Sequence, residues 1–249
     1  TGGLGRLYRG GAVFTDAYQD HAITETAPGH ASTLSGRFPR STGIVTNTAG
    51  VWDPQAPLLG AHGGADSENG SPASPFRFRG TTLTDWLRMR DPRTRALSVS
   101  RKDRGAILPM GRAKQSVFWY DPEAPPGPNG ATYGGFTTGH YYDDTLPSWV
   151  AAFNLAHPIG TYAGRVWTPL LAANAYPEPD TVRSENGGKD FTFPHALPRD
   201  ARHVAWELPY APWMDELTLA LALAGERALG LGLGPQTDVL AVSLSTTDA

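Results

Sequence analysis

The sequence predicts an α/β protein with a doubly wound, mostly parallel sheet and helices on both faces. A helical pattern followed by a short apolar strand pattern occurs twice, at residues 81–90 then 95–100 and at residues 212–229 then 238–245. The last segment, DVLAVSLS, is apolar on both faces at its centre. A strand buried on both sides is what a parallel sheet covered by helices requires.

The composition excludes several classes of protein. The 249 residues include 21 Lys and Arg against 24 Asp and Glu, and a formal charge of −3 gives no reason to expect a nucleic-acid partner or an anionic membrane surface. No run approaches the roughly 18 apolar residues of a membrane span, and the pattern of a signal peptide is absent. With no cysteine, the chain has no disulfide framework, thiolate metal site or Cys nucleophile.

Start and stop signals define the first two helices. The first is expected over residues 26–36, where Pro28 suits the first turn and Gly36 suits the end. The second is expected over residues 81–90, which open with the capping-box-like pattern Thr82-x-x-Asp85. Its apolar side chains share one face: Leu83, Trp86 and Leu87.

The strand at residues 95–100 is short and leads into a polar loop. The C-terminal helix is expected over residues 212–229, because acidic residues stand in its first turn and Gly230 stands just past its end. Its apolar face at helical spacing consists of Met214, Leu217, Leu221 and Ala224. The strand at residues 238–245 completes this pair.

Long irregular stretches, rich in Gly and Pro, lie at residues 60–80 and 121–139. Loops of this length in a compact domain are usually lids, insertions or disordered segments. We expect residues 1–249 to form part of one catalytic domain, with an insertion or lid region at roughly 110–210. The chain starts without Met and stops just after a strand-like run, so we expect a piece of a longer protein, incomplete at both ends.

Thr26 and Asn47 are the first candidates for chemistry. A hydroxyl at a helix N-terminus lies where backbone N–H groups and the helix dipole favour an anion, so a phosphate could be attacked there. Asn47 stands where a strand is expected to end, and its amide could donate to a phosphoryl oxygen. Thr26 could equally be an ordinary N-cap residue, and Asn47 an ordinary turn residue.

Lys102 and Arg104 follow the strand at residues 95–100. Alternate residues of an extended loop point the same way, so we expect both cations to converge on one anion. A solvated charged loop is the alternative, but the apolar residues 106–109 indicate that the loop turns inward. Asp248, at the carboxyl end of the last strand, suits a metal cation or the cap of a following helix.

None of the seven histidines shows the spacing of a metal site, so none is assigned to a metal. His30, on the first helix, is expected to be structural. Trp, Tyr and Phe are scattered, and no Gly-x-Gly-x-x-Gly or Walker-type loop is present.

Taken in order, these residues resemble one enzyme superfamily. Thr26-Ala27-Pro28-Gly29-His30-Ala31-Ser32, then Gly36, Thr42-Gly43-Ile44 and Asn47, closely resembles the nucleophile region of the alkaline phosphatases. The run SRKDRGAILP at residues 100–109 resembles the phosphate-clamp loop of the bacterial subgroup with a single Thr nucleophile. Segments 193–195, 240–243 and 245–248 complete the resemblance in the same order.

This resemblance implies an alkaline-phosphatase-like fold and metal-dependent hydrolysis of small phosphate monoesters through a covalent phospho-threonine, with release of inorganic phosphate. It implies Thr26 as nucleophile and zinc ligand, and Asp248 as ligand of the zinc that activates water. Asn47, Lys102 and Arg104 would hold the non-bridging oxygens. It also implies two zinc ions and a periplasmic or secreted protein.

Most zinc ligands of the family lie outside this resemblance: an Asp before the nucleophile helix and, after the position of Asp248, a Gly-His pair, an Asp-His pair and a final His. We therefore expect this chain alone to be inactive and metal-free. The near alternative is a phosphodiesterase or nucleotide pyrophosphatase of the same superfamily, which typically lacks the Lys-x-Arg clamp. Two further hypotheses are a non-catalytic binding module, with aromatic-rich loops at 118–120 and 141–149, and a cytosolic enzyme.

Overall fold

The computed structural model describes residues 2–48, 50–59, 72–124, 133–183 and 188–248. Its central sheet has four strands in the order β3–β2–β1–β6. These are β1 (Ala96–Ser100), β2 (Ser116–Asp121), β3 (Gly135–Thr137) and β6 (Val239–Ser243). β1 pairs in parallel with both β2 and β6, and β3 pairs antiparallel with β2. The sheet is therefore mostly parallel, as predicted.

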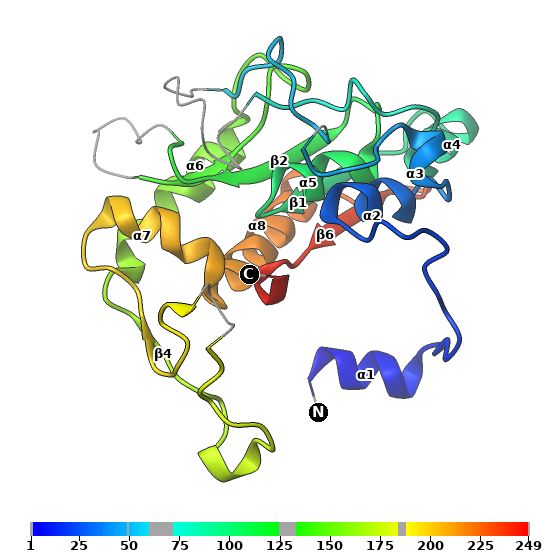
Figure 1. Cartoon of the computed structure of the whole chain (residues 1–249). Coiled ribbons are helices and arrows are strands. Elements are labelled where there is room, and N and C mark those ends of the chain that lie inside the picture. Colours follow the sequence, from blue (N-terminus) through cyan, green and yellow to red (C-terminus); the bar gives the residue numbers. More distant parts are fainter. Residues whose placement is uncertain (1, 49, 60–71, 125–132, 184–187, 249) are drawn as a thin grey trace.

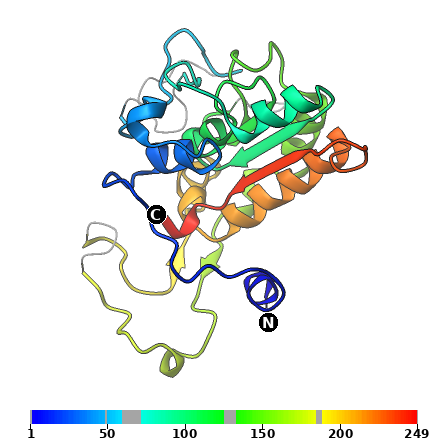
Figure 2. The ribbon, with the colours of Figure 1, turned by 90° about the vertical axis from the view of Figure 1, so that its right-hand side faces the viewer.

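Alternation of side chains along β1 and β2 supplies a core on each face of the sheet. One face carries Leu97, Val99, Phe118 and Tyr120, and it packs against α6 (Ser148–Ala156) and α8 (Trp213–Leu229). The opposite face carries Ala96, Val117 and Trp119, and it packs against α2 (Thr26–Thr33) and α5 (Asp103–Met110). Figures 1 and 2 show these helices on the two sides of the sheet, which confirms helices on both faces.

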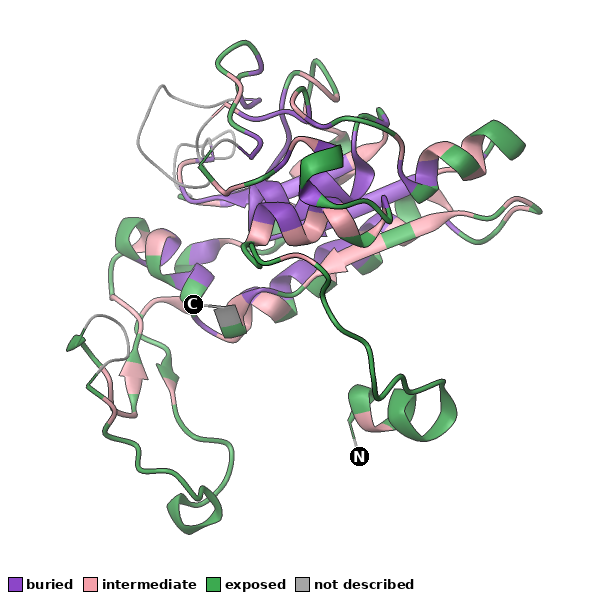
Figure 3. Cartoon of the chain, turned by 45° about the vertical axis from the view of Figure 1, so that its right-hand side comes forward, coloured by how far each residue is buried: buried purple, intermediate pink, exposed green. Residues whose placement is uncertain are grey.

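The remaining elements surround this centre. The helices are α1 (Gly3–Gly10), α3 (Pro39–Thr42), α4 (Leu83–Arg90) and α7 (Ala201–Glu207). The 3-10 turns are η1 (Ile159–Tyr162), η2 (Ala173–Ala175), η4 (Leu208–Tyr210) and η5 (Thr246–Asp248). A small antiparallel sheet pairs β4 (Val166–Trp167) with β5 (His195–Ala196). In Figure 3, α1 and the arm that carries β4 and β5 are mostly exposed, whereas the central elements are buried.

Local signals predicted two helices well. α8 ends at Gly230, whose backbone is left-handed (φ 60°, ψ 40°), and it buries Met214, Leu217 and Leu221 as expected. α4 begins after Thr82, whose backbone N–H donates to Asp85 Oδ2 at 2.8 Å. This is the predicted capping box.

The apolar face of α4 is not the face that the fold buries. Leu83 is 40% exposed and Trp86 is 53% exposed, whereas Thr84 is fully buried. The hydroxyl of Thr84 lies 3.5 Å from Met110 Sδ, at the end of α5. Helical periodicity shows which residues share a face, but only the packing of α4 against α5 decides which face is covered.

The prediction that the last strand is buried on both sides is wrong for the residues that the structure describes. The residues of β6 are half-buried, and Leu240 is 42% exposed. Within the part of the chain that the structure describes, β6 is an edge strand with β1 as its one neighbour. The apolar side chains of β6 are therefore only partly covered by the described residues.

The boundaries of an insertion at residues 110–210 stay a prediction. That range contains β2 and β3 of the central sheet as well as the arm that carries β4 and β5. Parts of both long loops, residues 60–71 and 125–132, lie outside the described residues. Among the helices that are described, none combines the length and the apolar character needed to cross a membrane.

Candidate functional site

Thr26 occupies the first helical position of α2, directly after Glu25. Glu25 is the N-cap residue, with extended backbone (φ −77°, ψ 163°), and its side chain makes no capping hydrogen bond. The interpretation of Thr26 as an ordinary N-cap residue is therefore wrong. Thr26 stands, half-buried, at the end of the helix where the positive end of the dipole attracts anions, although Pro28 in the same turn has no N–H group to offer.

Asn47 is brought to the same place. Its Oδ1 accepts from the backbone N–H of Ala27 at 2.7 Å, and its own N–H donates to Glu25 Oε2 at 2.6 Å. The predicted strand before Asn47 is absent: residues 44–47 form no strand, because Asn47 bonds to Glu25 and opens a turn closed by the N–H of Gly50. Thus the structure joins two predicted site residues that stand 21 positions apart.

Gly50 permits the close approach of this turn to α2. A Cβ atom at position 50 would lie 2.9 Å from the Cβ of Ala27 and 3.1 Å from the carbonyl oxygen of Asn47. A larger residue would separate Asn47 from the first turn of the helix.

Lys102 and Arg104 lie at the start of α5. Lys102 is the N-cap residue (φ −100°, ψ 137°), and its N–H donates to Ser100 Oγ at 3.1 Å. Arg104 is already helical, and its N–H donates to Asp103 Oδ1 at 2.5 Å. The predicted extended loop is therefore wrong for Arg104, since Asp103 satisfies that N–H and starts the helix.

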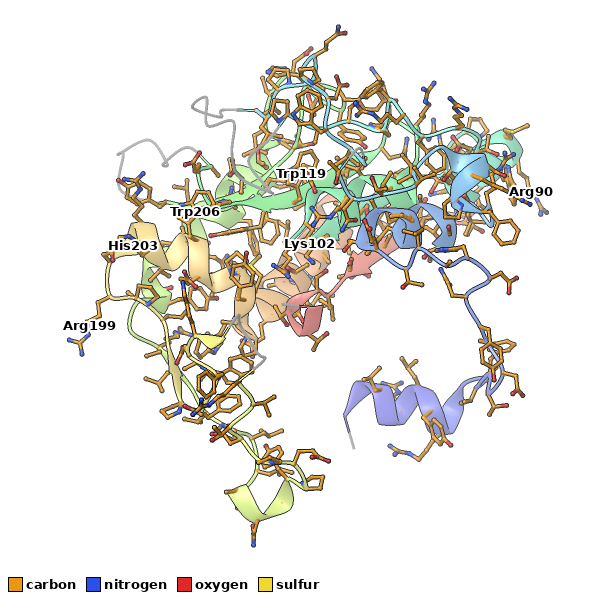
Figure 4. The ribbon with its side chains drawn as sticks, viewed as in Figure 1. Arg90, Lys102, Trp119, Arg199, His203 and Trp206 are labelled. Atoms are coloured by element: carbon orange, nitrogen blue, oxygen red, sulfur yellow. The ribbon has the colours of Figure 1, made fainter. Side chains whose placement is uncertain are left out.

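The predicted inward turn of this segment is confirmed. Lys102 is 7% exposed and Arg104 is 8% exposed, so a solvated charged loop is excluded. The Arg104 guanidinium lies 3.5 Å from Asp103 Oδ1. Figure 4 shows Lys102 at the end of the central strands, close to α2 and to the C-terminal turn.

A groove of about 950 Å³ runs along the open edge of β6, from Thr237 before the strand to Ser245 after it, and its lining does not include Asn47, Lys102 or Arg104. Its lining includes Thr26 and His30 of α2, Gly105 of α5, and Ser243 and Ser245 at the end of β6. α2 packs against α5, and α5 follows β1 directly. The N-termini of both helices, which are the positive ends of their dipoles, therefore lie near the carboxyl edge of the sheet, where ligands bind in doubly wound sheets.

Asp248 ends η5, just beyond β6, but its side chain lies outside the described residues. The turn itself is held by Asp215 of α8. The Asp215 carboxylate accepts from the N–H of Ser245 at 3.0 Å, from the N–H of Thr246 at 3.2 Å, and from the Thr246 hydroxyl at 2.6 Å. Asp215 therefore serves a tertiary contact, where the sequence suggested only a favourable interaction with the helix dipole.

Sequence reasoning did not anticipate a second set of polar residues beside the groove. His30 Nδ1 lies 2.8 Å from the carbonyl oxygen of Thr26, and His30 Nε2 lies 2.9 Å from Ser243 Oγ. Ser243 Oγ in turn lies 3.1 Å from Ser245 Oγ. The four-residue spacing of Thr26 and His30 was the one available signal, because such residues are neighbours on a helix.

One of the two aromatic segments proposed for a binding module is not a loop. Phe118, Trp119 and Tyr120 belong to β2 and are buried. Phe118 packs edge-on against Trp149 of α6, with ring centroids 5.2 Å apart. These aromatic rings stabilise the core, so the first of the two loops on which that hypothesis rested is absent, whereas residues 141–147 do form an irregular segment and that part of the hypothesis stays a prediction.

Comparison with known proteins identifies the family of this chain. The family model described as type I phosphodiesterase / nucleotide pyrophosphatase matches residues 1–249. This chain belongs to that family.

Curated members of the family include enzymes named alkaline phosphatases. The chain is 33% identical to PhoV of Synechococcus elongatus, over 99% of the chain and 45% of PhoV. It is 32% identical to PhoK of a Sphingomonas species, over 100% of the chain and 42% of PhoK. The predicted relationship to the alkaline phosphatase superfamily is confirmed, and the chain spans about half the length of these curated relatives.

A solved family member has the same fold. The crystal structure of wild-type alkaline phosphatase PafA superposes with a TM-score of 0.77 at 29% sequence identity, covering 92% of this chain and 45% of PafA. This match confirms the alkaline-phosphatase-like fold class.

The described residues do not fit a centre for two zinc ions. Among them, no group of three or more His, Cys, Asp or Glu side chains could hold a metal ion. Of the two expected zinc ligands in the chain, Thr26 supplies a hydroxyl, and zinc sites in proteins are built mainly from His, Cys and carboxylate ligands.

Proposed function

We propose that this chain forms the nucleophile and phosphate-binding part of a phosphomonoesterase. The observation that carries the proposal is the 2.7 Å hydrogen bond from Ala27 N–H to Asn47 Oδ1, which sets the Asn47 amide beside the helix that begins at Thr26. Because its oxygen is bound to Ala27, the amide has its NH₂ group as the end that can donate to a phosphoryl oxygen.

In this proposal Thr26 Oγ1 attacks the phosphorus atom of a small phosphorylated substrate. The bond from phosphorus to the ester oxygen breaks, and the alcohol leaves with a proton. Water then cleaves the phospho-threonine, which restores the hydroxyl and releases inorganic phosphate. Asn47, Lys102 and Arg104, with the N-termini of α2 and α5, offset the negative charge of the transition state.

The pair of cations favours monoesters over diesters. A monoester presents three non-bridging oxygens, whereas in a diester a second ester group replaces one of them. Lys102 and Arg104 are both nearly buried, so they can form charge-assisted hydrogen bonds with little competition from water. The relatives PhoV, PhoK and PafA are named alkaline phosphatases, which supports this choice.

A solved variant of PafA supports the choice of residues. In that variant one Thr, one Asn, one Lys and one Arg are substituted; the Thr and Asn stand 21 positions apart and the Lys and Arg stand two positions apart. Thr26 and Asn47, and Lys102 and Arg104, have the same two spacings here.

Diester hydrolysis is the second candidate, because the family description names phosphodiesterases and nucleotide pyrophosphatases. For a longer protein that contains this chain, the proposal has three further parts. They are two zinc ions, a periplasmic or secreted location, and a single catalytic domain with an insertion at roughly 110–210.

Substitution of Lys102 tests the monoester assignment. The test measures kcat/KM for p-nitrophenyl phosphate and for bis-p-nitrophenyl phosphate, in the chain and in a longer protein that contains it. We expect Lys102→Ala to lower the monoester value about 10²- to 10³-fold, the range seen when one charge-stabilising donor is lost, and to change the diester value far less.

Lys114→Ala is the matched control, since Lys114 is an exposed lysine that lies over the ring of Tyr141. It should leave both values unchanged. A monoester preference that survives Lys102→Ala would overturn the role assigned to Lys102, and a higher wild-type value for the diester would favour the second candidate.

A further inference from the structure

We propose that His30 is a positioning residue, which ties the nucleophile helix α2 to a hydrogen-bonded hub at the ends of β6 and β1. The hub consists of Ser243, Ser245, Asp215 and Arg101. This proposal rests on the proposed function, because it takes Thr26 to be the nucleophile.

His30 makes one local contact and one long-range contact. A carbonyl oxygen only accepts, so the 2.8 Å contact with Thr26 O assigns a proton to His30 Nδ1. His30 Nε2 then pairs at 2.9 Å with the hydroxyl of Ser243, a residue 213 positions further along the chain. The imidazole therefore links the carbonyl group of the nucleophile residue itself to β6.

Ser245 connects this link to two further elements. Its hydroxyl lies 3.1 Å from Ser243 Oγ, and its N–H donates to Asp215 of α8 at 3.0 Å. Its carbonyl oxygen accepts from Arg101 Nε at 3.1 Å. Arg101 is 3% exposed and directly precedes Lys102, so the same serine contacts the segment that holds the phosphate-binding cations.

Close packing keeps the hub compact. A Cβ atom at Gly105 would lie 2.5 Å from Ser100 Oγ and 3.4 Å from Ser243 Oγ. α5 therefore lies directly against the serines of β1 and β6. Through the hub, the position of Thr26 is coupled to that of Lys102, although the two residues lie on different elements.

The chain contains a matched control for the local half of the contact. His157 Nδ1 lies 2.9 Å from the carbonyl oxygen of Phe153, four residues earlier, and the His157 ring stacks on Phe153. This is the same local geometry as that of His30 and Thr26. His157 stands at the C-terminal end of α6 and is not a member of the hub, so His157→Ala removes a comparable bond without touching the hub.

Amide hydrogen exchange of α2 tests the hub in the 249-residue chain. We expect His30→Ala and Ser243→Ala each to speed exchange at residues 29–33 about tenfold, because each breaks the link that holds this helix to β6. The double variant should exchange no more than about twofold faster than either single variant, since both remove one shared interaction. His157→Ala should leave α2 unchanged.

His30→Asn distinguishes the effect of the long-range link to Ser243 from the effect of the local hydrogen bond to Thr26 O. Its shorter amide can still donate to Thr26 O but does not reach Ser243. Wild-type exchange in His30→Asn, or additive effects of His30→Ala and Ser243→Ala, would overturn the proposal.

Measurement of kcat and KM tests the effect of His30 on catalysis independently of hydrogen exchange. Where phosphatase activity is present, His30→Ala should lower kcat about 10- to 100-fold, as substitution of orienting residues does, with KM changed less than about threefold. A chain whose α2 exchange depends on Ser243 but which hydrolyses no phosphate ester would refute the proposed function and leave the hub intact. Activity and exchange that are both unaffected by His30→Ala would refute the hub.

Discussion

Asp121 shows how far burial alone can change the chemistry of one residue. Its side chain is 1% exposed at the carboxyl end of β2, and burial raises the pKa of this carboxyl to about 6, with the nearby charge of Glu123 acting in the same direction. The hydrogen bond from the N–H of Glu123 opposes the shift in pKa but does not cancel it. Compared with the unfolded chain, the fold therefore favours the protonated form of Asp121.

The raised pKa of Asp121 predicts that the free energy of unfolding falls as the pH rises. Because the folded-state pKa of Asp121 lies above the ordinary 3.8, its favourable contribution is fully present below about pH 4 and is lost as the pH rises to about 6. At 1.36 kcal/mol per pKa unit, the buried carboxylate lowers the free energy of unfolding by about 3 kcal/mol above that range.

Asp121→Asn should therefore stabilise the chain by about 2 kcal/mol at pH 8 and by little at pH 4, because the amide has the same shape and never ionises. Urea unfolding at the two pH values measures this difference. Asp144→Asn, at an exposed aspartate, is the control for the exchange of a carboxylate for an amide at the surface. An equal effect of Asp121→Asn at both pH values would contradict the assigned cause.

At the scale of elements, α8 owes its position to a glycine inside the helix. A Cβ atom at Gly225 would lie 2.5 Å from Leu97 Cδ2 and 2.8 Å from Trp149 Cη2. Replacing Gly by Ala within a helix usually stabilises it by about 1 kcal/mol. Here the added methyl group would overfill a packed core, which typically costs about 1–3 kcal/mol.

We therefore expect Gly225→Ala to lower the free energy of unfolding by up to about 2 kcal/mol despite its better helix propensity. Denaturant unfolding measures this change. The control is Leu223→Ala, on the half-exposed side of the same helix. It should lower the free energy of unfolding by less than truncation of a buried leucine does. Stabilisation by Gly225→Ala would show that α8 can move away from β1 at little cost.

At the scale of the whole molecule, the described residues supply the helix that carries the proposed nucleophile, a helix that carries two buried cations, and an edge strand. They supply few metal ligands. For the 249-residue chain by itself we predict that zinc is not held tightly, since Thr26 and Asp248 are two oxygen ligands and cannot hold two ions.

Metal analysis after dialysis against zinc measures this directly. We expect well under one zinc ion per chain and no zinc-dependent rise in the melting temperature. Two zinc ions retained per chain, together with full phosphatase activity, would refute the prediction. A longer relative such as PhoK, treated in the same way, is the comparison protein.

The sequence by itself determined the features that depend on neighbours along the chain. The capping box at Thr82 and the left-handed stop at Gly230 were predictable because each rests on residues within one turn of helix. The chemical types at Thr26, Asn47, Lys102 and Arg104 were also readable, and the order of these residues indicated the superfamily.

Only the tertiary structure decided which of these residues meet. Asn47 reaches α2 through Ala27 and Glu25, His30 reaches Ser243 across 213 positions, and α4 buries Thr84 in place of its apolar face. No local periodicity encodes such contacts, because they depend on how helices and strands pack once the sheet has formed. The sequence therefore determined the parts and their chemistry, and packing over long chain separations decided the site that they form.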